Sequence, residues 1–267
     1  MQPAGLSPEQ RDTLETRGLV KLPGAIPQRD AEAMADRLWA TLAAKHHIQK
    51  GVPATWTVER PSSLGHLCAT GAFGKCASPA VTAALDGLLG AWTPPKTWGP
   101  VLVCFPNGEP AWSLPHQSWH LDSPADAKGP MLTRLARVFA ILAPLEPQGG
   151  ATLVAEGSHV LAEREAHAAG HQLRSAEVRK RLARHAWIRD LATPGDRKAR
   201  VGRFMDEPTE VDGVDLRVTE MTGEPGDVWM MHPNCLHAGA PNVRNGPRMV
   251  VTQWIYAEGA NPWGAKP

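Results

Sequence analysis

The sequence carries almost no net charge, because 28 lysines and arginines stand against 27 aspartates and glutamates in 267 residues. It therefore lacks the basic surface of a nucleic-acid-binding protein and the polybasic face of a peripheral membrane protein. It also lacks any run of about 18 apolar residues without a charge, which excludes a membrane-spanning helix. We expect a small-molecule partner and neither nucleic acid nor membrane. The oligomeric state does not follow from the sequence.

Cysteine is scarce as well, with four residues and no Cys-x-x-Cys spacing. This number is too small for a disulfide framework in a chain of this length, so we expect reduced thiols. The first residues show no basic start followed by an apolar segment, so the sequence predicts no secretory signal. A cytoplasmic location is the expectation.

Glycine and proline are frequent, at 25 residues each, which favours short strands and turns over an all-helical fold. Ser7-Pro8-Glu9-Gln10 is typical of a helix start, and Gly18 can end that helix. After a short strand at 19–22, apolar residues at helical spacing predict a second helix over 31–43. Residues 50–100 show no sustained period and predict loops and short helices.

From residue 100 onward the pattern changes to strands. They are expected at 100–106, 132–142, 151–154, 214–219, 227–231 and 248–256, with helices at 158–169 and 175–191. The helices form an insertion over about 158–205, between core strands at about 100–157 and 211–257. We expect one domain over 1–267, mainly β with flanking helices. The predicted fold is a double-stranded β-helix, a cupin-like jelly roll of two facing sheets with N-terminal helices and the helical insertion over its mouth.

The most specific motif is Trp119-His120-Leu121-Asp122. Side chains two residues apart on a strand share a face, roughly 6–7 Å apart at Cα, so His120 and Asp122 can bind one ion. His237, which ends a strand and turn beginning at Gly226, offers a third ligand. Two histidines and one carboxylate leave coordination positions open, which suits non-haem Fe(II) binding a co-substrate and O₂ together. Such a pair also occurs by chance among 11 histidines, so its weight depends on its neighbours.

Arg248 is such a neighbour. It follows a Gly246-Pro247 turn and opens the apolar strand at 249–255. An arginine at the start of a buried strand needs an anionic partner, because burying its charge alone is costly. A dicarboxylate co-substrate would supply that partner.

Nearly the whole chain resembles the phytanoyl-CoA dioxygenase family of Fe(II)/2-oxoglutarate oxygenases. The resemblance rests on 17–26, His120, Asp122, Gly149-Gly150-Ala151-Thr152-Leu153-Val154, Gly157-Ser158-His159, Pro225-Gly226-Asp227, His237, Pro241-Asn242 and Arg248. It implies that His120, Asp122 and His237 are the catalytic iron ligands, and that Arg248 binds the distal carboxylate of 2-oxoglutarate.

The resemblance suggests further co-substrate contacts at Gln117 and Thr152. Many relatives carry a serine two residues after the second histidine, where this chain has Gly239. Gly239 lacks the side chain for that hydrogen bond.

Several nearby residues have simpler structural interpretations. We interpret His116 and His232 as histidines on the surface or behind the metal ligands, and Cys235 as a small buried apolar residue. Most of the ten tryptophans are expected in the core, with Trp56, Trp112 and Trp119 as candidates to line a substrate cavity.

Two arginines, Arg134 and Arg137, interrupt the apolar strand predicted over 132–142. By strand parity they are expected on opposite faces, so at most one points inward. That arginine holds either a substrate carboxylate or an acidic neighbour.

The resemblance implies an Fe(II)- and 2-oxoglutarate-dependent dioxygenase that uses O₂ to hydroxylate a small organic molecule, releasing succinate and CO₂. Asp122 fills the carboxylate position, which argues against a halogenase, while desaturation, epoxidation and ring formation stay open. A coenzyme A thioester is not the expected substrate, since the sequence shows no phosphate-cradling loop. One alternative is a non-redox cupin-like isomerase or hydrolase, in which Arg248 and Gln117 have no task. The other is a catalytically silent binding protein, against which the intact triad argues.

Overall fold

The computed structural model describes residues 5–126 and 131–260. Its strands are β1 (Leu19–Leu22), β2 (Trp92–Thr93), β3 (Val101–Cys104), β4 (Leu135–Ile141), β5 (Thr152–Glu156), β6 (Thr209–Val211), β7 (Val214–Glu220), β8 (Val228–Met231), β9 (Leu236–Gly239) and β10 (Arg248–Ala257). Its α-helices are α1 (Pro8–Arg17), α2 (Gln28–His46), α3 (Gly65–Ala69), α4 (Pro79–Leu89), α5 (Ser158–Ala169), α6 (Ser175–Leu182), α7 (Ala186–Leu191) and α8 (Arg197–Val201). Among the described residues, no helix is long and apolar enough to cross a membrane.

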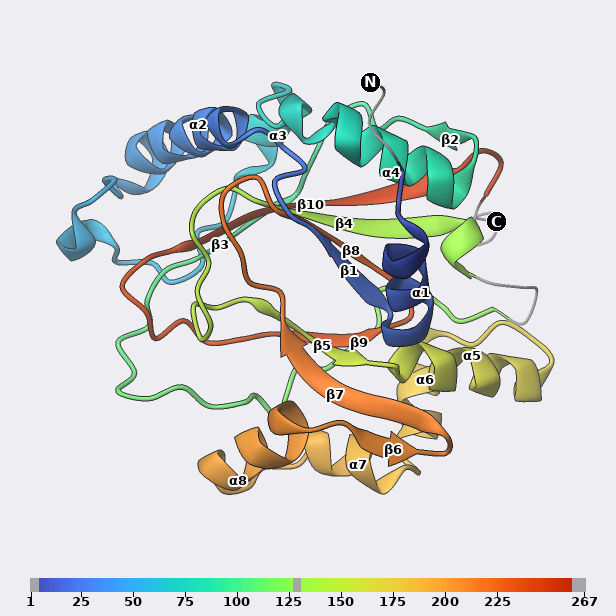
Figure 1. Ribbon diagram of the computed structural model, residues 1–267. Coiled ribbons are helices and arrows are strands. Elements are labelled where there is room, and N and C mark those ends of the chain that lie inside the picture. Colours follow the sequence, from blue (N-terminus) through green and yellow to red (C-terminus); the bar gives the residue numbers. More distant parts are fainter. Residues whose placement is uncertain (1–4, 127–130, 261–267) are drawn as a thin grey trace.

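The strands form two antiparallel sheets that face each other (Figure 1). The larger sheet has the order β1-β8-β4-β10-β2, with β3 also paired to β10, and the smaller has the order β6-β7-β5-β9. Among the described residues no strand pair joins the two sheets, so the jelly roll is not a closed barrel. The predicted fold class, a double-stranded β-helix with flanking helices, is confirmed.

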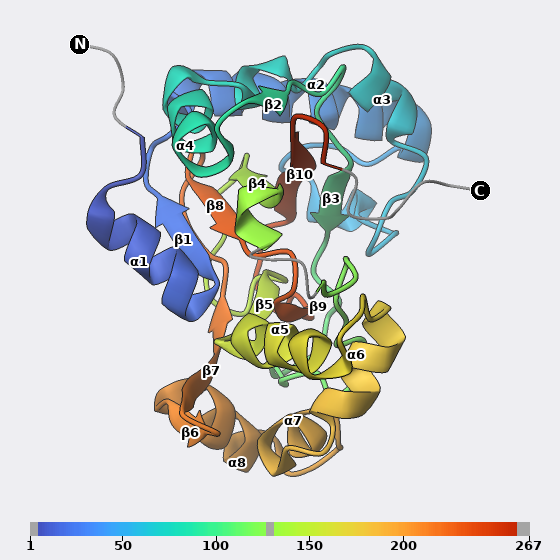
Figure 2. The same cartoon turned by 90° about the vertical axis from the view of Figure 1, so that its right-hand side faces the viewer.

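Three apolar clusters hold these layers together. Between the sheets lie buried side chains such as Phe139, Met231 and Val250. The outer face of the larger sheet packs against α2 and α4, and the outer face of the smaller sheet packs against α5, α6 and α7. In Figure 1 these two groups of helices lie on opposite sides of the molecule, and Figure 2 shows the same layers after a quarter turn. Alternating strand residues therefore have a buried partner on each face.

The N-terminal elements follow local sequence signals. The Ser7 hydroxyl accepts a hydrogen bond from the Gln10 N–H, and the Gln10 side chain accepts one from the Ser7 N–H. Gly18 ends α1 in the left-handed conformation, at φ 83°. The predicted strand at 19–22 and the second helix are also confirmed, although Ala43 lies on the exposed side of α2.

Other predictions are wrong in detail. The single helix expected over 175–191 is two, α6 and α7. The loops and short helices expected over 50–100 are present, and α4 is the longest of these helices, with eleven residues after the Ser78 cap. Arg134 precedes β4, because a 3₁₀ turn at Met131–Thr133 delays the start of the strand. The His120–Asp122 pair is not on a regular strand either, since only His120 forms an isolated bridge.

Candidate metal centre

His120, Asp122 and His237 converge, each offering one ligand atom within 4.8 Å of the others. His120 Nε2 lies 3.3 Å from Asp122 Oδ1, and His237 Nε2 lies 3.3 Å from Asp122 Oδ2. Two reciprocal backbone hydrogen bonds, of 2.9 and 3.0 Å, join His120 to His237 on β9. This bridge, and not a shared strand, sets the distance between the two imidazoles.

The backbone also orients both rings. His120 Nδ1 lies 2.7 Å from the carbonyl oxygen of Ser118, and His237 Nδ1 lies 3.0 Å from that of Cys235. Because a carbonyl only accepts, each Nδ1 carries a proton. In the neutral ring the lone pair is on Nε2, where a metal could bind, and in the protonated ring Nε2 donates to Asp122. A hydrogen bond of this kind typically supports a metal-binding histidine. The donor set and its orientation therefore fit a divalent metal.

Electrostatic interactions couple the Asp122 carboxylate to the two histidines. Burial alone would raise the pKa of Asp122, but hydrogen bonds from His120 and His237 outweigh it and hold the pKa below its ordinary value. The hydrogen bond that His120 Nε2 donates to the Asp122 carboxylate raises the pKa of His120. The His120 side chain is 47% exposed and that of His237 6%, so the centre opens to solvent on the His120 side.

Arg248 lies in the interior at the start of β10. Its Nη1 donates to the Gly150 carbonyl at 3.1 Å and its Nη2 to Thr152 Oγ1 at 2.7 Å, while its buried Nε has no partner. Burial lowers the pKa of Arg248 to about 10. Thr152 pairs in register with Gly239, two residues beyond His237 on β9. The structure therefore brings Arg248 and Thr152 together beside the strand that carries His237.

A cavity of about 590 Å³ is lined by Ser118 and Gly239, each two residues from a triad histidine, while the triad side chains themselves do not line it. Its walls include Gln117, His116, Gly239 and part of the helical insertion at 194–200. Arg60 also lines it, and its Nη1 would lie 4.0 Å from a Cβ placed on Gly239. Arg60 was missed in the sequence because it lies in an irregular segment far from every motif, and only the fold brings it here.

The side chains of the other residues considered from the sequence do not belong to the triad. His232 is buried, not on the surface, with Nε2 3.2 Å from Glu163 Oε1 and its ring 4.5 Å from that of His159. Cys235 is buried as expected, and burial raises the pKa of its thiol. The tryptophans expected at a substrate cavity pack in apolar clusters instead: Trp56, Trp112 and Trp119.

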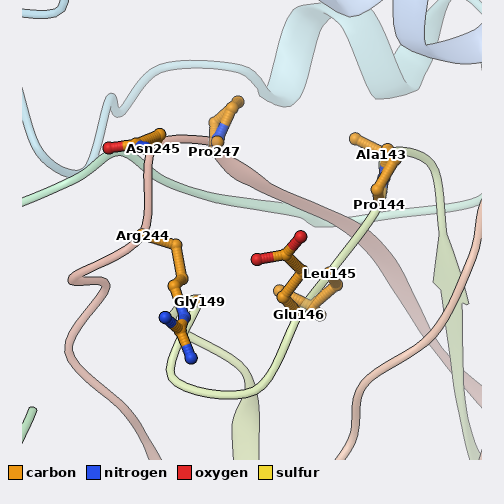
Figure 3. A pocket seen from close by; sticks show the side chains of 9 residues that line it. Ala143, Pro144, Leu145, Glu146, Gly149, Arg244, Asn245 and Pro247 are labelled. Atoms are coloured by element: carbon orange, nitrogen blue, oxygen red, sulfur yellow. The ribbon is translucent and has the colours of Figure 1, made fainter.

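A second hollow, of about 350 Å³, lies between the loop that follows β4 and the loop that precedes β10 (Figure 3). Its walls carry the side chains of Glu146 and Arg244, and Arg244 Nε donates to the Pro147 carbonyl at 2.8 Å. None of the triad residues lines it. The groups able to hold a metal therefore lie elsewhere.

Solved structures with similar folds include EctD from S. alaskensis with 2-oxoglutarate and 5-hydroxyectoine (TM-score 0.58, 15% identity, covering 100% of this chain and 84% of that one). The alpha ketoglutarate dependent carbocyclase SnoK from nogalamycin biosynthesis has a TM-score of 0.54 at 16% identity, over 95% of this chain and 86% of that one. HygX from Streptomyces hygroscopicus, with nickel and 2-oxoglutarate bound, has a TM-score of 0.50 at 14% identity, over 97% and 90% of the two chains. At such identities the likeness is one of fold.

No curated protein matches the sequence. The family described as Phytanoyl-CoA dioxygenase (PhyH) matches residues 14–250, which is most of the chain. The protein therefore belongs to the phytanoyl-CoA dioxygenase family.

Proposed function

We propose that this protein is an Fe(II)- and 2-oxoglutarate-dependent dioxygenase that hydroxylates a small organic molecule and releases succinate and CO₂. The observation that carries the proposal is the convergence of His120, Asp122 and His237, with ligand atoms within 4.8 Å of one another. Membership of the phytanoyl-CoA dioxygenase family supports the same class of chemistry.

His120, Asp122 and His237 would hold the iron. Two imidazole nitrogens and one carboxylate suit Fe(II) and leave positions for other ligands. When bound, the iron would supply the centre at which 2-oxoglutarate and O₂ react to oxidise the substrate. The protein contributes the fixed orientation of both rings, through the carbonyls of Ser118 and Cys235.

Arg248 and Thr152 would bind the distal carboxylate of 2-oxoglutarate. The unpartnered Nε of Arg248 is a buried charged donor, which an incoming carboxylate would satisfy. Gln117, in the wall of the adjacent cavity, is proposed as a further contact. A non-redox enzyme on the same fold would leave Arg248 without an anion, which favours the oxygenase over the isomerase or hydrolase.

The proposal is tested by adding Fe(II) and then 2-oxoglutarate to the protein without oxygen. We expect one Fe(II) per chain and the visible charge-transfer band of an iron–keto acid chelate. Substitutions His120→Ala and His237→Ala should abolish the band, because each removes one of three ligands. The exposed His66→Ala serves as the control and should keep it. A requirement for His232 or Cys235, with His237 dispensable, would show the metal assignment to be wrong.

The mass of the product identifies the type of reaction. Hydroxylation adds one oxygen atom to the substrate, whereas ring formation or desaturation removes two hydrogen atoms, so the product mass separates them. This measurement matters because one protein of similar fold is described as a carbocyclase. Succinate release from 2-oxoglutarate in the presence of Fe(II) separates all of these reactions from a silent binding protein.

A further inference from the structure

Arg137 lies on β4 beside the metal centre. In the register of the larger sheet it pairs with Trp254 on β10 and with Met231 on β8. Its guanidinium carbon lies 4.4 Å from the centroid of the Trp254 ring and 5.4 Å from that of Phe139. The residue is 9% exposed. Contacts with these aromatic rings therefore restrain the guanidinium.

The Nε of Arg137 is buried and has no hydrogen-bond partner among the described residues. The nearest acid is Asp122, with Oδ2 at 3.7 Å from Nε, which is too long for a hydrogen bond. By contrast, Arg134 lies 2.8 Å from Asp126 Oδ2. A buried Nε–H without a hydrogen bond is costly unless a ligand accepts from it.

Asp122 is not available as that partner. Its two oxygens already face the Nε2 atoms of His120 and His237, each at 3.3 Å. In the proposed function its charge is further committed to a metal ion. The charge of Arg137 faces Asp122 at 3.7 Å, but its Nε–H has no acceptor and is available to a second anion.

We propose that Arg137 is a specificity-determining residue that binds a carboxylate of the prime substrate beside the metal centre. A single planar guanidinium matches a planar carboxylate through two parallel hydrogen bonds. The inference rests on the proposed function, because the metal centre defines what a substrate at Arg137 would approach.

The cavity of about 590 Å³ beside Ser118 and Gly239, which Arg137 does not line, has a charge that suits an acidic substrate. Its lining includes Arg60, Arg197 and Arg200 and no aspartate or glutamate. A cationic approach attracts an anion and disfavours a cation.

Arg137 and Arg248 lie in different parts of the interior. Arg137 pairs with Trp254, six residues along β10 from Arg248, which is about 20 Å at the usual rise per strand residue. The distal carboxylate of 2-oxoglutarate at Arg248 therefore does not account for Arg137.

The test compares carboxylic acids with their own primary amides. Pairs with aliphatic, cyclic and aromatic skeletons are titrated by calorimetry into protein loaded with Ni(II) and 2-oxoglutarate. In the wild type we expect the best acids to bind at least about tenfold more tightly than their amides. Arg137→Gln should lose this preference and Arg137→Lys should keep part of it. Arg134→Gln, which removes an arginine already paired with Asp126, is the matched control and should keep it.

Several results would overturn the proposal. They are equal binding of acids and amides by the wild type, an unchanged preference in Arg137→Gln, and tighter binding of the matching alkyl phosphates or sulfonates. A weaker affinity of Arg137→Gln for 2-oxoglutarate would also overturn it, because Arg137 would then serve the co-substrate. A wild type without the iron–2-oxoglutarate band refutes the proposed function, whereas a normal band without a preference for acids refutes only the carboxylate site.

Discussion

Arg248 uses two of its nitrogens for hydrogen bonds to Gly150 and Thr152 and leaves a buried Nε unpaired. Both acceptors are neutral, so they satisfy donors without balancing the charge. A buried cation in this condition is poorly stabilised by the protein alone. The arrangement is better suited to binding an anion than to holding the two sheets together.

Replacing Arg248 should therefore weaken co-substrate binding more than it weakens the fold. Losing one partner of a buried charge pair costs about 2–5 kcal/mol, and about 1.4 kcal/mol is a factor of ten. We expect Arg248→Ala to raise the 2-oxoglutarate concentration required at least about tenfold, and Arg248→Lys to recover part of the loss because an ammonium lacks the planar fork. Titrating 2-oxoglutarate against the charge-transfer band measures this. An unshifted titration with a lowered melting temperature would mean that Arg248 is structural.

At the scale of elements, the sequence predicts best what neighbouring residues determine. The cap at Ser7, the stop at Gly18 and the apolar period of α2 lie within their own segments, and those elements form as predicted. The strand expected around His120 does not form, because pairing depends on β9, more than 100 residues away.

The candidate site shows the same division. The triad residues and Arg248 could be identified from the sequence motifs and from their order along the chain. The structure brings the triad together. The position of Arg60 at the cavity and the unpartnered Nε of Arg137 could not be predicted, because each depends on which strands and loops become neighbours in the fold. Strand parity placed Arg134 and Arg137 on opposite faces without deciding which one points inward, and the observed start of β4 after Arg134 leaves only Arg137 on the strand.

Gly18, which ends α1, should tolerate no side chain. Its φ is 83°, and an added Cβ would meet Cys235 Sγ and lie 2.5 Å from His159 Nδ1. Gly24 is the matched control, since its φ is 59° and nothing lies within 4 Å of an added Cβ. Gly24→Ala should lower the free energy of unfolding by roughly 1–2 kcal/mol, because alanine is strained in the left-handed conformation. Gly18→Ala should lower it by roughly 1–3 kcal/mol more, because the added Cβ overpacks the site. Urea unfolding of both variants measures the difference, and equal losses would contradict the crowding at Gly18.

At the scale of the whole molecule, the candidate centre draws its residues from both sheets and from irregular chain. His237 belongs to the smaller sheet, Arg137 and Arg248 to the larger, and His120 and Asp122 to the irregular chain between β3 and β4. A ligand bound by all of them would act across the interface between the sheets. Binding to the native state alone should then stabilise the entire fold.

The stability that His120 gives the metal-free protein and the stabilisation by bound metal should change with pH in opposite directions. In metal-free protein the pKa of His120 is raised by Asp122. The contribution of His120 to stability is therefore complete below its ordinary pKa of about 6.5 and is lost as pH rises through the raised value. Asp122 has a lowered pKa, so its contribution is present above its ordinary value of 3.8 and falls only in stronger acid.

A metal ion binds only the neutral form of His120, so protons compete with the metal. Metal binding therefore strengthens as pH rises through the raised pKa of His120, where the metal-free protein loses the stability that protonated His120 contributes. We expect the rise in melting temperature caused by Ni(II), a redox-stable probe, to be small in mild acid and to grow as pH increases through the raised pKa of His120. Melting curves at a series of pH values, with and without Ni(II), measure the rise. In His237→Ala the rise should be much smaller at every pH, because one ligand is missing. A rise that does not change with pH in the wild type would mean that the metal binds away from His120 and Asp122.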